Sequence, residues 1–263
     1  MRIDATELYV APTVGEGDPL VLIHGGWTDH TTWNALAGPL ARSFLVLRYD
    51  RRGHSRSARG PVRPTRRRHE DDLAALLETV GPAHLIGTSY GAAIALALAG
   101  RRPELVRGVV AHEPPLLGLV PMPEIEALFR GVARQIEAGE PAAATKRFFE
   151  AAVLGRGGWG LVPEPVRRAA IGNAQTFVDM LADPGWAGLD VTAAARFPGP
   201  VLVTHGDTGP GWLPRLAISV ADRIGRPKTL IPGAGHMPHH THPDAFAAIV
   251  AAFVGAQAPR RAA

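Results

Sequence analysis

Ser89 lies in the motif Gly-Thr-Ser-Tyr-Gly (residues 87–91), with a glycine two residues away on either side. The motif follows a short apolar run, residues 84–86, and precedes an alanine-rich stretch, residues 92–99. This order predicts a strand, a sharp turn and a helix, with the serine at the apex of the turn. There the hydroxyl stands clear of the sheet, close to helix N–H groups that favour negative charge, so the motif is typical of a serine that attacks a carbonyl carbon.

His236 is the candidate base. A serine nucleophile needs a group that accepts its proton, usually a histidine held in orientation by a carboxylate. His236 ends a Pro-Gly-Ala-Gly-His loop (residues 232–236) between the last expected strand and the last expected helix. A loop at that place reaches back over the sheet edge, and it agrees with the usual chain order of serine, acid and histidine. We therefore predict that His236 accepts the proton of Ser89.

The negative oxygen formed during such an attack needs two backbone N–H donors aimed at one point. The residue after the nucleophile usually supplies one of them, which here is the N–H of Tyr90. The turn after the first long strand reads His-Gly-Gly-Trp (residues 24–27), and its glycines leave the amides unshielded. We predict the N–H of Gly26 as the second donor; the alternative is a plain glycine turn.

Two carboxylates compete to be the acid that orients His236. Glu113 ends the strand expected at residues 107–112, beside the strand of the serine and at the same edge of the sheet. Asp207 follows the strand expected at residues 201–205. A glutamate side chain is long enough to reach an imidazole over a neighbouring strand, so both carboxylates are candidates at this point.

Short apolar runs bounded by turn residues alternate with helical stretches, which is the spacing of βαβ units and of a buried parallel sheet. The expected strands lie at residues 20–23, 44–49, 85–87, 107–112, 201–205 and 228–231. The expected helices of this part lie at residues 32–41, 70–80, 92–99, 214–224 and 243–254. The sequence therefore predicts an α/β fold with a mostly parallel sheet flanked by helices.

The segment between the fourth and fifth of these strands differs, because proline- and glycine-rich breaks separate amphipathic stretches at residues 124–138, 142–154 and 165–181. We predict an inserted helical cap subdomain at residues 115–196 on a core domain of residues 1–114 and 197–263; the alternative is a helical extension packed as plain core. A cleft between cap and core suits an apolar substrate. The candidate substrate-binding residues are Trp27, Phe129, Trp159, Phe177 and Trp186.

Composition limits the function classes. The chain has 263 residues, 46% of them hydrophobic and 20% charged, and no apolar run long enough to span a membrane. With no signal-peptide pattern and no cysteine, we expect a cytoplasmic protein without disulfides and without a membrane partner. The net charge is only +4, and the basic cluster at residues 63–68 runs directly into acidic residues, so we expect no nucleic-acid partner. The sequence leaves open whether the protein forms a homodimer.

Four motifs taken together resemble the α/β-hydrolase superfamily: His-Gly-Gly (24–26), Tyr-Asp-Arg-Arg-Gly-His-Ser (49–55), Gly-Thr-Ser-Tyr-Gly (87–91) and Gly-Ala-Gly-His (233–236). The resemblance covers nearly the whole chain. It implies an eight-stranded, mostly parallel sheet, with the nucleophile after the fifth strand and a cap between the sixth and seventh. It implies no metal and no organic cofactor.

The resemblance also bears on the acid. In that superfamily the acid usually follows the seventh strand, three residues after a glycine, and here Gly209 occupies that position. The branch that includes the fungal zearalenone lactonases instead takes a glutamate after the sixth strand, and His112-Glu113-Pro114 looks like that pattern. Residues 231–238 and 242–246 resemble the histidine loop and following helix of the same enzymes. The resemblance therefore implies Glu113 as the acid, with Asp207 as the alternative.

We predict from these residues a serine hydrolase that cleaves a small, apolar carboxylic ester or lactone through an acyl-enzyme, with macrolactones of the zearalenone type among the candidate substrates. The same fold and triad also support hydrolysis of a carbon–carbon bond or another acyl transfer. A non-catalytic ligand receptor on this fold is the third reading, and the complete set of serine, histidine and carboxylate argues against it. No feature of the sequence predicts a metal site, because the nearby His239, His240 and His242 lack cysteine or carboxylate partners at metal-ligand spacing.

Overall fold

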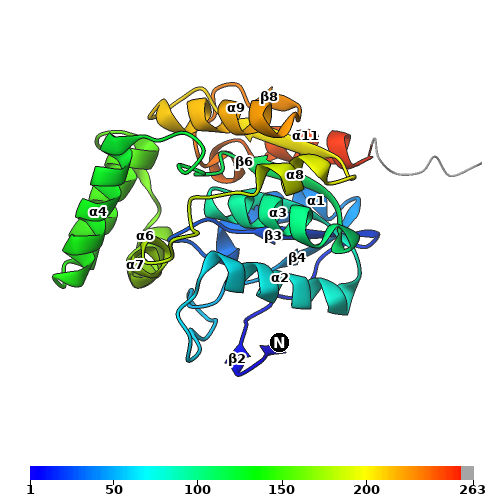
Figure 1. Ribbon diagram of the computed structural model, residues 1–263, viewed down its shortest axis with the longest axis horizontal. Coiled ribbons are helices and arrows are strands. Elements are labelled where there is room, and N and C mark those ends of the chain that lie inside the picture. Colours follow the sequence, from blue (N-terminus) through cyan, green and yellow to red (C-terminus); the bar gives the residue numbers. More distant parts are fainter. Residues whose placement is uncertain (256–263) are drawn as a thin grey trace, which may run out of the picture.

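A computed structural model describes residues 1–255. Its centre is a sheet of six parallel strands in the spatial order β4-β3-β5-β6-β7-β8 (Figure 1). The strands are β3 (Asp18–Ile23), β4 (Phe44–Arg48), β5 (Ala83–Thr88), β6 (Val106–His112), β7 (Val201–His205) and β8 (Lys228–Leu230). The chain runs from β3 outward to β4 and then returns to β5 on the other side of β3. The loops after β3 and β5 therefore diverge at the switch point of the sheet, where α/β proteins form their ligand sites.

The predicted α/β fold with a mostly parallel sheet flanked by helices is confirmed, but the expected number of eight strands in the sheet is corrected to six within residues 1–255. The two-residue strands β1 (Arg2–Ile3) and β2 (Thr6–Glu7) pair only with each other. The following segment runs antiparallel to β4 and forms two isolated bridges, Val14 to Val46 within β4 and Val10 to Tyr49 just after it. Pro12 stands between these bridges and has no N–H to donate, so a continuous ladder does not form there.

Helices cover both faces of the sheet, as the alternation of side chains along a strand requires (Figure 1). Leu20 and Leu22 of β3 pack in one buried cluster with α1 (Asn34–Leu40) and α11 (Pro243–Gly255). Val21 and Ile23 point to the opposite face and pack in a second cluster. The helices of that second face are α2 (Arg66–Val80), α3 (Tyr90–Arg101), α8 (Val191–Arg196) and α9 (Trp212–Ile224).

The segment between β6 and β7 holds most of the remaining helices, and Figure 1 shows α4, α6 and α7 grouped to one side of the sheet. We use the name cap segment for residues 115–196. Its elements before α8 are α4 (Pro123–Glu137), α5 (Pro141–Phe148), η3 (Phe149–Leu154), η4 (Gly158–Leu161), α6 (Glu164–Gly172) and α7 (Ala174–Leu181). The amphipathic stretch expected at residues 165–181 forms two helices, α6 and α7, which meet at Asn173.

α8 lies at the end of the cap segment but packs against α3 in the core. A Cβ on Gly100 of α3 would come within 3.0 Å of the Cβ of Ala193, so glycine is needed for this close approach. Ala194 is buried in the same cluster as α3 and α9. The last turn of the cap segment is thus held by the core, while the helices before it extend from the sheet.

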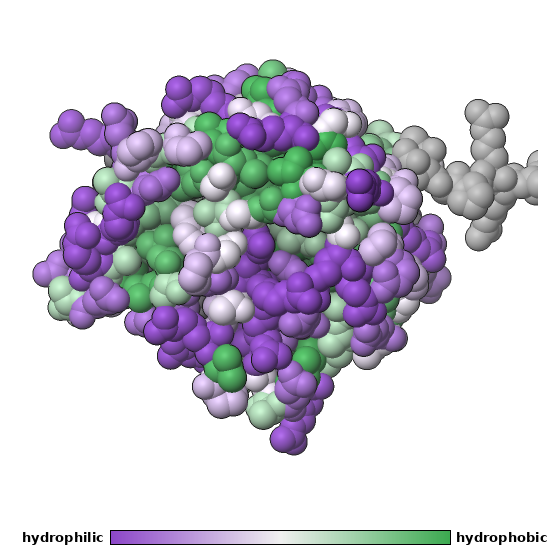
Figure 2. All heavy atoms as spheres, viewed as in Figure 1, coloured by the Kyte–Doolittle hydropathy of each residue, from purple (hydrophilic) through white to green (hydrophobic). Residues whose placement is uncertain are grey.

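The first turns of α2 carry the basic cluster, and its charges are paired. Nε of Arg66 lies 3.2 Å from Oε1 of Glu70, and Nε of Arg67 lies 3.5 Å from Oδ1 of Asp71. Hydrophilic side chains cover this part of the surface in Figure 2. No helix within residues 1–255 combines the length and the apolar character that a membrane span needs. The short remaining elements are η1 (His30–Trp33), η2 (Pro103–Leu105) and α10 (Pro238–Thr241).

Candidate active site

Ser89 lies between the end of β5 and the start of α3 with φ +52° and ψ −127°, a conformation that L-residues seldom adopt. The two flanking glycines make this turn sterically allowed. A Cβ on Gly87 would lie 2.5 Å from the carbonyl oxygen of Gly91, and a Cβ on Gly91 would lie 2.2 Å from that of Ile23. The Ser89 N–H donates to the carbonyl of His112 at 2.8 Å, which ties the turn to the end of β6. The predicted sharp turn is therefore a strained elbow that presents the serine hydroxyl.

Glu113 and His236 come together although 123 residues separate them. His236 Nδ1 donates to Glu113 Oε2 at 2.7 Å, and the Gly206 N–H donates to Glu113 Oε1 at 3.0 Å. Glu113 is 1% exposed and, like Ser89, has a positive φ, +44°. Because Nδ1 of His236 carries the hydrogen toward the carboxylate, Nε2 is the nitrogen that remains to accept a proton.

The charge of Glu113 is retained in spite of its burial. Burial raises the pKa of the carboxyl group, but the hydrogen bond from His236, the nearby His112 and the hydrogen bond from Gly206 outweigh this and lower the pKa to about 2. Glu113 is therefore a carboxylate at neutral pH. In that form it holds the His236 ring in one tautomer and stabilises an imidazolium when one forms.

Asp207 is not brought to His236. Its side chain is exposed, and Oδ1 accepts the N–H of Gly233 at 2.9 Å. The backbone N–H of Asp207 in turn donates to the carbonyl of Ala234 at 2.9 Å. Asp207 thus fastens the outside of the loop that carries His236, and the orienting contact belongs to Glu113.

The two predicted N–H donors lie on either side of Ser89. Tyr90 is the first residue of α3, where a backbone N–H has no partner within the helix. A Cβ on Gly25 would lie 3.1 Å from the Cβ of Ser89, so the turn after β3 passes directly beside the nucleophile. A Cβ on Gly26 would meet nothing within 4 Å, because this residue borders open space.

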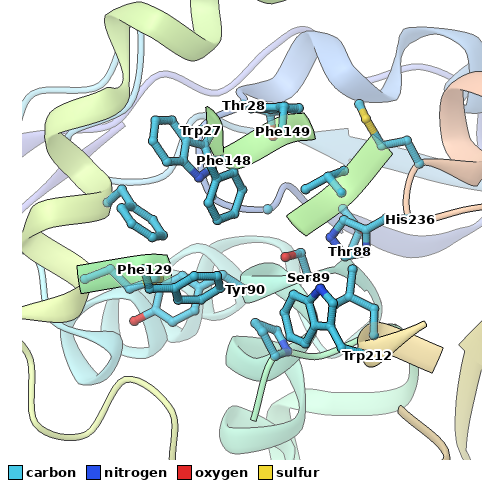
Figure 3. Close-up of a pocket in the computed structure, with 18 of the residues that line it drawn as sticks. Trp27, Thr28, Thr88, Ser89, Tyr90, Phe129, Phe148, Phe149, Trp212 and His236 are labelled. Atoms are coloured by element: carbon cyan, nitrogen blue, oxygen red, sulfur yellow. The ribbon is translucent and has the colours of Figure 1, made fainter. Parts of the chain in front are cut away.

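That open space is a cavity lined by Ser89, Tyr90 and His236 together with a set of apolar side chains. Figure 3 shows Ser89 between His236 on one side and the rings of Trp27, Phe129 and Phe148 on the other. No Asp, Glu, Lys or Arg of the described chain lines it. The apolar lining residues are Trp27, Pro115, Phe129, Phe148, Phe149, Val153, Phe177, Met180, Trp186, Trp212, Leu213 and Met237.

Four of the five predicted substrate-binding residues line this cavity: Trp27, Phe129, Phe177 and Trp186. The prediction for Trp159 is corrected, because its indole packs on Phe149, with ring centroids 5.0 Å apart, and does not reach the cavity. Trp212 was missed. It is the first residue of α9, and its place just after the loop that follows β7 is the signal that could have identified it.

Trp27 joins the core to the cap segment. It has a positive φ, +71°, and its ring stacks on Phe177 of α7 with centroids 4.8 Å apart. Phe148 of α5 lies at the same centroid distance from Trp27. One core residue, two positions after Gly25, therefore forms an aromatic cluster with two cap helices.

Asn173, at the junction of α6 and α7, contacts the same turn through polar groups. Its Nδ2 donates to the carbonyl of Trp27 at 3.1 Å, and its Oδ1 accepts the N–H of Ser55 at 2.8 Å. The residue is 3% exposed. Since a buried amide that bonds two backbone groups is costly to remove, Asn173 holds the cap segment in register with the turn beside Ser89.

We expect Asn173→Ala to lower the free energy of unfolding by about 1–3 kcal/mol, because the buried Trp27 carbonyl and the part-buried Ser55 N–H lose their partner. Hydrolytic activity should fall with it, since the turn after β3 is released. Thermal unfolding and kcat/KM for a neutral aryl ester measure the two effects. Asn34→Ala is the matched control, because Asn34 is exposed and its Oδ1 accepts only from Arg48 on the surface. Equal effects of the two substitutions would contradict this role of Asn173.

Two groups of side chains hold potential metal-ligand atoms within 4.8 Å of one another. In the first, His236 and Glu113 already bond each other. In the second, Asp50 Oδ1 accepts both the N–H and Nδ1 of His30, at 2.8 and 2.6 Å. The ligand atoms named here are therefore engaged within the protein, whereas Nε2 of His112 has no hydrogen-bond partner among the described residues. The groups are His112, Glu113 and His236, and Asp29, His30 and Asp50.

The chain is similar to known proteins in sequence and in structure. The sequence profile described as the alpha/beta hydrolase family matches residues 20–249. A 2-(acetamidomethylene)succinate hydrolase from Mesorhizobium japonicum is 27% identical over 262 residues, covering 92% of this chain and 90% of that protein. The uncharacterized hydrolase YraK of Bacillus subtilis is 41% identical over 110 residues, a match that covers 40% of this chain and 41% of YraK. Est816, described as an N-acyl homoserine lactone degrading enzyme, has a solved structure with a TM-score of 0.79 and 25% identity, covering 96% of this chain and 98% of Est816.

Proposed function

Since the chain belongs to the alpha/beta hydrolase family, we propose that it is a serine hydrolase that cleaves carboxylic esters or lactones through an acyl-enzyme. One observation carries the proposal. A serine on a strained elbow shares an uncharged cavity with a histidine whose other ring nitrogen is held by a buried carboxylate. That arrangement suits attack by an oxygen nucleophile on a neutral carbonyl compound.

The reaction follows from the positions of the groups. Nε2 of His236 takes the proton of the Ser89 hydroxyl as its oxygen attacks the carbonyl carbon, and the N–H groups of Gly26 and Tyr90 stabilise the oxyanion. Collapse of the tetrahedral intermediate breaks the ester bond, and His236 returns the proton to the leaving alcohol. A water molecule, deprotonated by His236, then hydrolyses the acyl-enzyme. For a lactone, the alcohol and the acid end as parts of one product.

The lining of the cavity supports a neutral, apolar substrate. A substrate carboxylate buried among Phe129, Phe148, Phe177 and Trp186 would have no cation to pair with, and an unpaired buried charge is strongly unfavourable. Flat or cyclic groups suit these rings, which offer large apolar faces. We therefore include aryl esters and lactones, up to macrolactones of the zearalenone type, in the proposed range.

The cap segment has a defined part in this proposal. Residues 115–196 supply one wall of the cavity, from Phe129 to Trp186, and the core of residues 1–114 and 197–263 supplies the triad. Aromatic contacts with Trp27 and the polar contacts of Asn173 hold the two parts together. We propose that this segment selects the substrate and limits the access of water.

A panel of substrates tests the proposal. We expect hydrolysis of p-nitrophenyl hexanoate with a kcat/KM about 10²-fold higher than that of the p-nitrophenyl monoester of adipic acid, which has the same chain length and a terminal carboxylate. Release of p-nitrophenolate is the measurement, and neutral lactones are followed by proton release. Preference for the charged ester would contradict the assignment of substrate class.

The same panel separates the alternatives. Turnover of a vinylogous 1,5-diketone without turnover of any ester or lactone would assign carbon–carbon bond hydrolysis. Labelling of Ser89 by a fluorophosphonate without turnover of any compound would assign a ligand receptor.

A further inference from the structure

Arg51 is a buried cation next to the candidate active site that the mechanism above does not use. It is 1% exposed, and its guanidinium contacts neutral groups. Nε donates to the carbonyl of His24 at 3.1 Å, and Nη2 donates to that of Gly25 at 2.8 Å. The guanidinium carbon lies 5.2 Å from the centre of the Tyr90 ring. In the chain as described, through residue 255, no carboxylate forms an ion pair with Arg51.

An arginine buried without a carboxylate is unusual, because an unpaired charge is costly to remove from water. Burial lowers the pKa of the Arg51 guanidinium to about 10, so the group still carries its charge at neutral pH. Nη1 has no hydrogen-bond partner among the described residues. The charge is thus maintained at a place where the resting protein does not neutralise it.

The carbonyl oxygen of Gly25 is held by two donors. One is Nη2 of Arg51, and the other is Nδ1 of His24, at 2.9 Å. The tautomer of His24 follows from a third bond, because the backbone N–H of Arg51 donates to His24 Nε2 at 2.9 Å. Nδ1 therefore carries the hydrogen, and burial together with the charge of Arg51 keeps the pKa of His24 well below its usual value. Two donors on one carbonyl fix the plane of the Gly25–Gly26 peptide.

That plane determines where the Gly26 N–H points. In a trans peptide the carbonyl and the N–H of the next residue point in opposite directions. With the Gly25 oxygen directed to Arg51, the Gly26 N–H is directed away from Arg51. Gly26 borders the cavity beside Ser89, where the oxyanion would form.

We propose that Arg51 is a positioning residue of the oxyanion hole. By holding the Gly25 carbonyl, Arg51 aims the Gly26 N–H, and its unpaired charge is balanced when the oxyanion forms. A cation bonded to the carbonyl polarises the peptide and strengthens its N–H as a donor. A fixed charge near a developing anion stabilises the transition state without reorganisation. The inference rests on the proposed function, since it needs an oxyanion to be formed at Ser89.

Arg51→Met removes the charge and the three side-chain bonds, to His24, Gly25 and His54, whereas Arg51→Lys keeps the charge and loses the forked geometry. We expect kcat for a neutral p-nitrophenyl ester to fall about 10²-fold in Arg51→Met, with KM changed less than about threefold, and to fall less in Arg51→Lys. Arg52→Lys is the matched control. Arg52 is also buried, at 3% exposure, but its Nε bonds Asp72 at 2.8 Å, away from the oxyanion turn. Its kcat per active site should stay near that of the parent.

If Arg51 had only a structural role, its substitution would not change the relative rates of hydrolysis of an ester and of the matching thionoester, in which sulfur replaces the carbonyl oxygen. Because a thionoester makes weaker hydrogen bonds in the oxyanion hole, the ratio of ester to thionoester kcat should fall in Arg51→Met and stay constant in Arg52→Lys. All rates are normalised to the sites labelled by a fluorophosphonate, so misfolded protein does not contribute. If little Arg51→Met folds, the same ratio is measured in Arg51→Lys.

An unchanged ester-to-thionoester ratio in both Arg51 variants, or equal losses of kcat in Arg51→Lys and Arg52→Lys, would overturn the role of Arg51. Failure of the proposed function looks different, because the parent protein itself would then hydrolyse no ester or lactone. A parent that is labelled but does not turn over esters still allows the test. The rate constant of phosphonylation then replaces kcat, since attack on phosphorus builds an oxyanion at the same position.

Discussion

Ser89→Ala should reduce hydrolysis by about 10⁶-fold in kcat, to the level of the oxyanion hole and binding alone. The reason is that the alanine side chain has no oxygen to form the acyl-enzyme, while the elbow keeps its shape. Gly87 and Gly91 still permit the turn, and the Ser89 N–H bond to His112 is a backbone contact that alanine retains. Initial rates of p-nitrophenolate release from a neutral ester are the measurement.

Ser43→Ala is the control for this substitution, because Ser43 is an exposed serine outside the cavity. It should keep the parent rate and the parent stoichiometry of fluorophosphonate labelling, whereas Ser89→Ala should lose both. Thermal unfolding of the two variants shows that neither effect comes from loss of fold. Parent-like activity in Ser89→Ala would end the proposed mechanism as a whole.

Glu113→Gln should lower kcat by about 10³- to 10⁴-fold, while Asp207→Asn should stay within about threefold of the parent. Glutamine has nearly the same shape as glutamate, but it lacks the charge that holds Nδ1–H of His236 and stabilises the imidazolium. Asp207 bonds only the backbone of the histidine loop and is exposed, so its loss is tolerated. Steady-state rates of the two variants on one ester compare them directly. The reverse ranking would assign the acid to Asp207.

The pH dependence of stability gives an independent measurement on Glu113. Burial raises its pKa, but the bonds from His236 and Gly206 and the nearby His112 lower it overall, from 4.5 to about 2 in the folded protein. The carboxylate therefore stabilises the fold fully above pH 4.5, and this contribution is lost as the pH falls from 4.5 toward 2. The difference in the free energy of unfolding between the parent and Glu113→Gln should be constant above about pH 5.5 and shrink below pH 4.5. Urea unfolding at pH 7 and pH 3 tests this, and a difference that grows at pH 3 would contradict it.

The position of Ser89 could be predicted because it depends on a few consecutive residues. Glycines at positions 87 and 91 leave room for a strained serine between them, and the apolar run before it and the alanine-rich run after it place that serine at the end of a strand. The loop of His236 was found for a similar reason, as a glycine-rich connection between a strand and a helix. Local sterics and periodicity encode both features, so no tertiary contact was needed to propose them.

The parts of the site that were corrected depend on how distant segments pack. Trp159 was predicted to bind the substrate and Trp212 was not, but Phe149 lies against Trp159, while the loop after β7 brings Trp212 to the cavity. The amphipathic stretch expected at residues 165–181 is divided at Asn173, whose side chain bonds the core turn. In the same way, the structure reveals Arg51 as a partner of the Gly25 carbonyl, which periodicity and motif spacing do not indicate.

By itself, therefore, the sequence determined the fold class, the elbow of Ser89, the loop of His236 and the short choice between Glu113 and Asp207. Only the tertiary structure shows which of the two carboxylates contacts His236. Glu113 and Asp207 both follow strands of one parallel sheet, and the two strands are neighbours, so spacing along the chain cannot rank their distances to His236. The register of β6 against β7 and the positive φ of Glu113 turn that carboxylate inward to Nδ1, while Asp207 is left on the outer side of the loop.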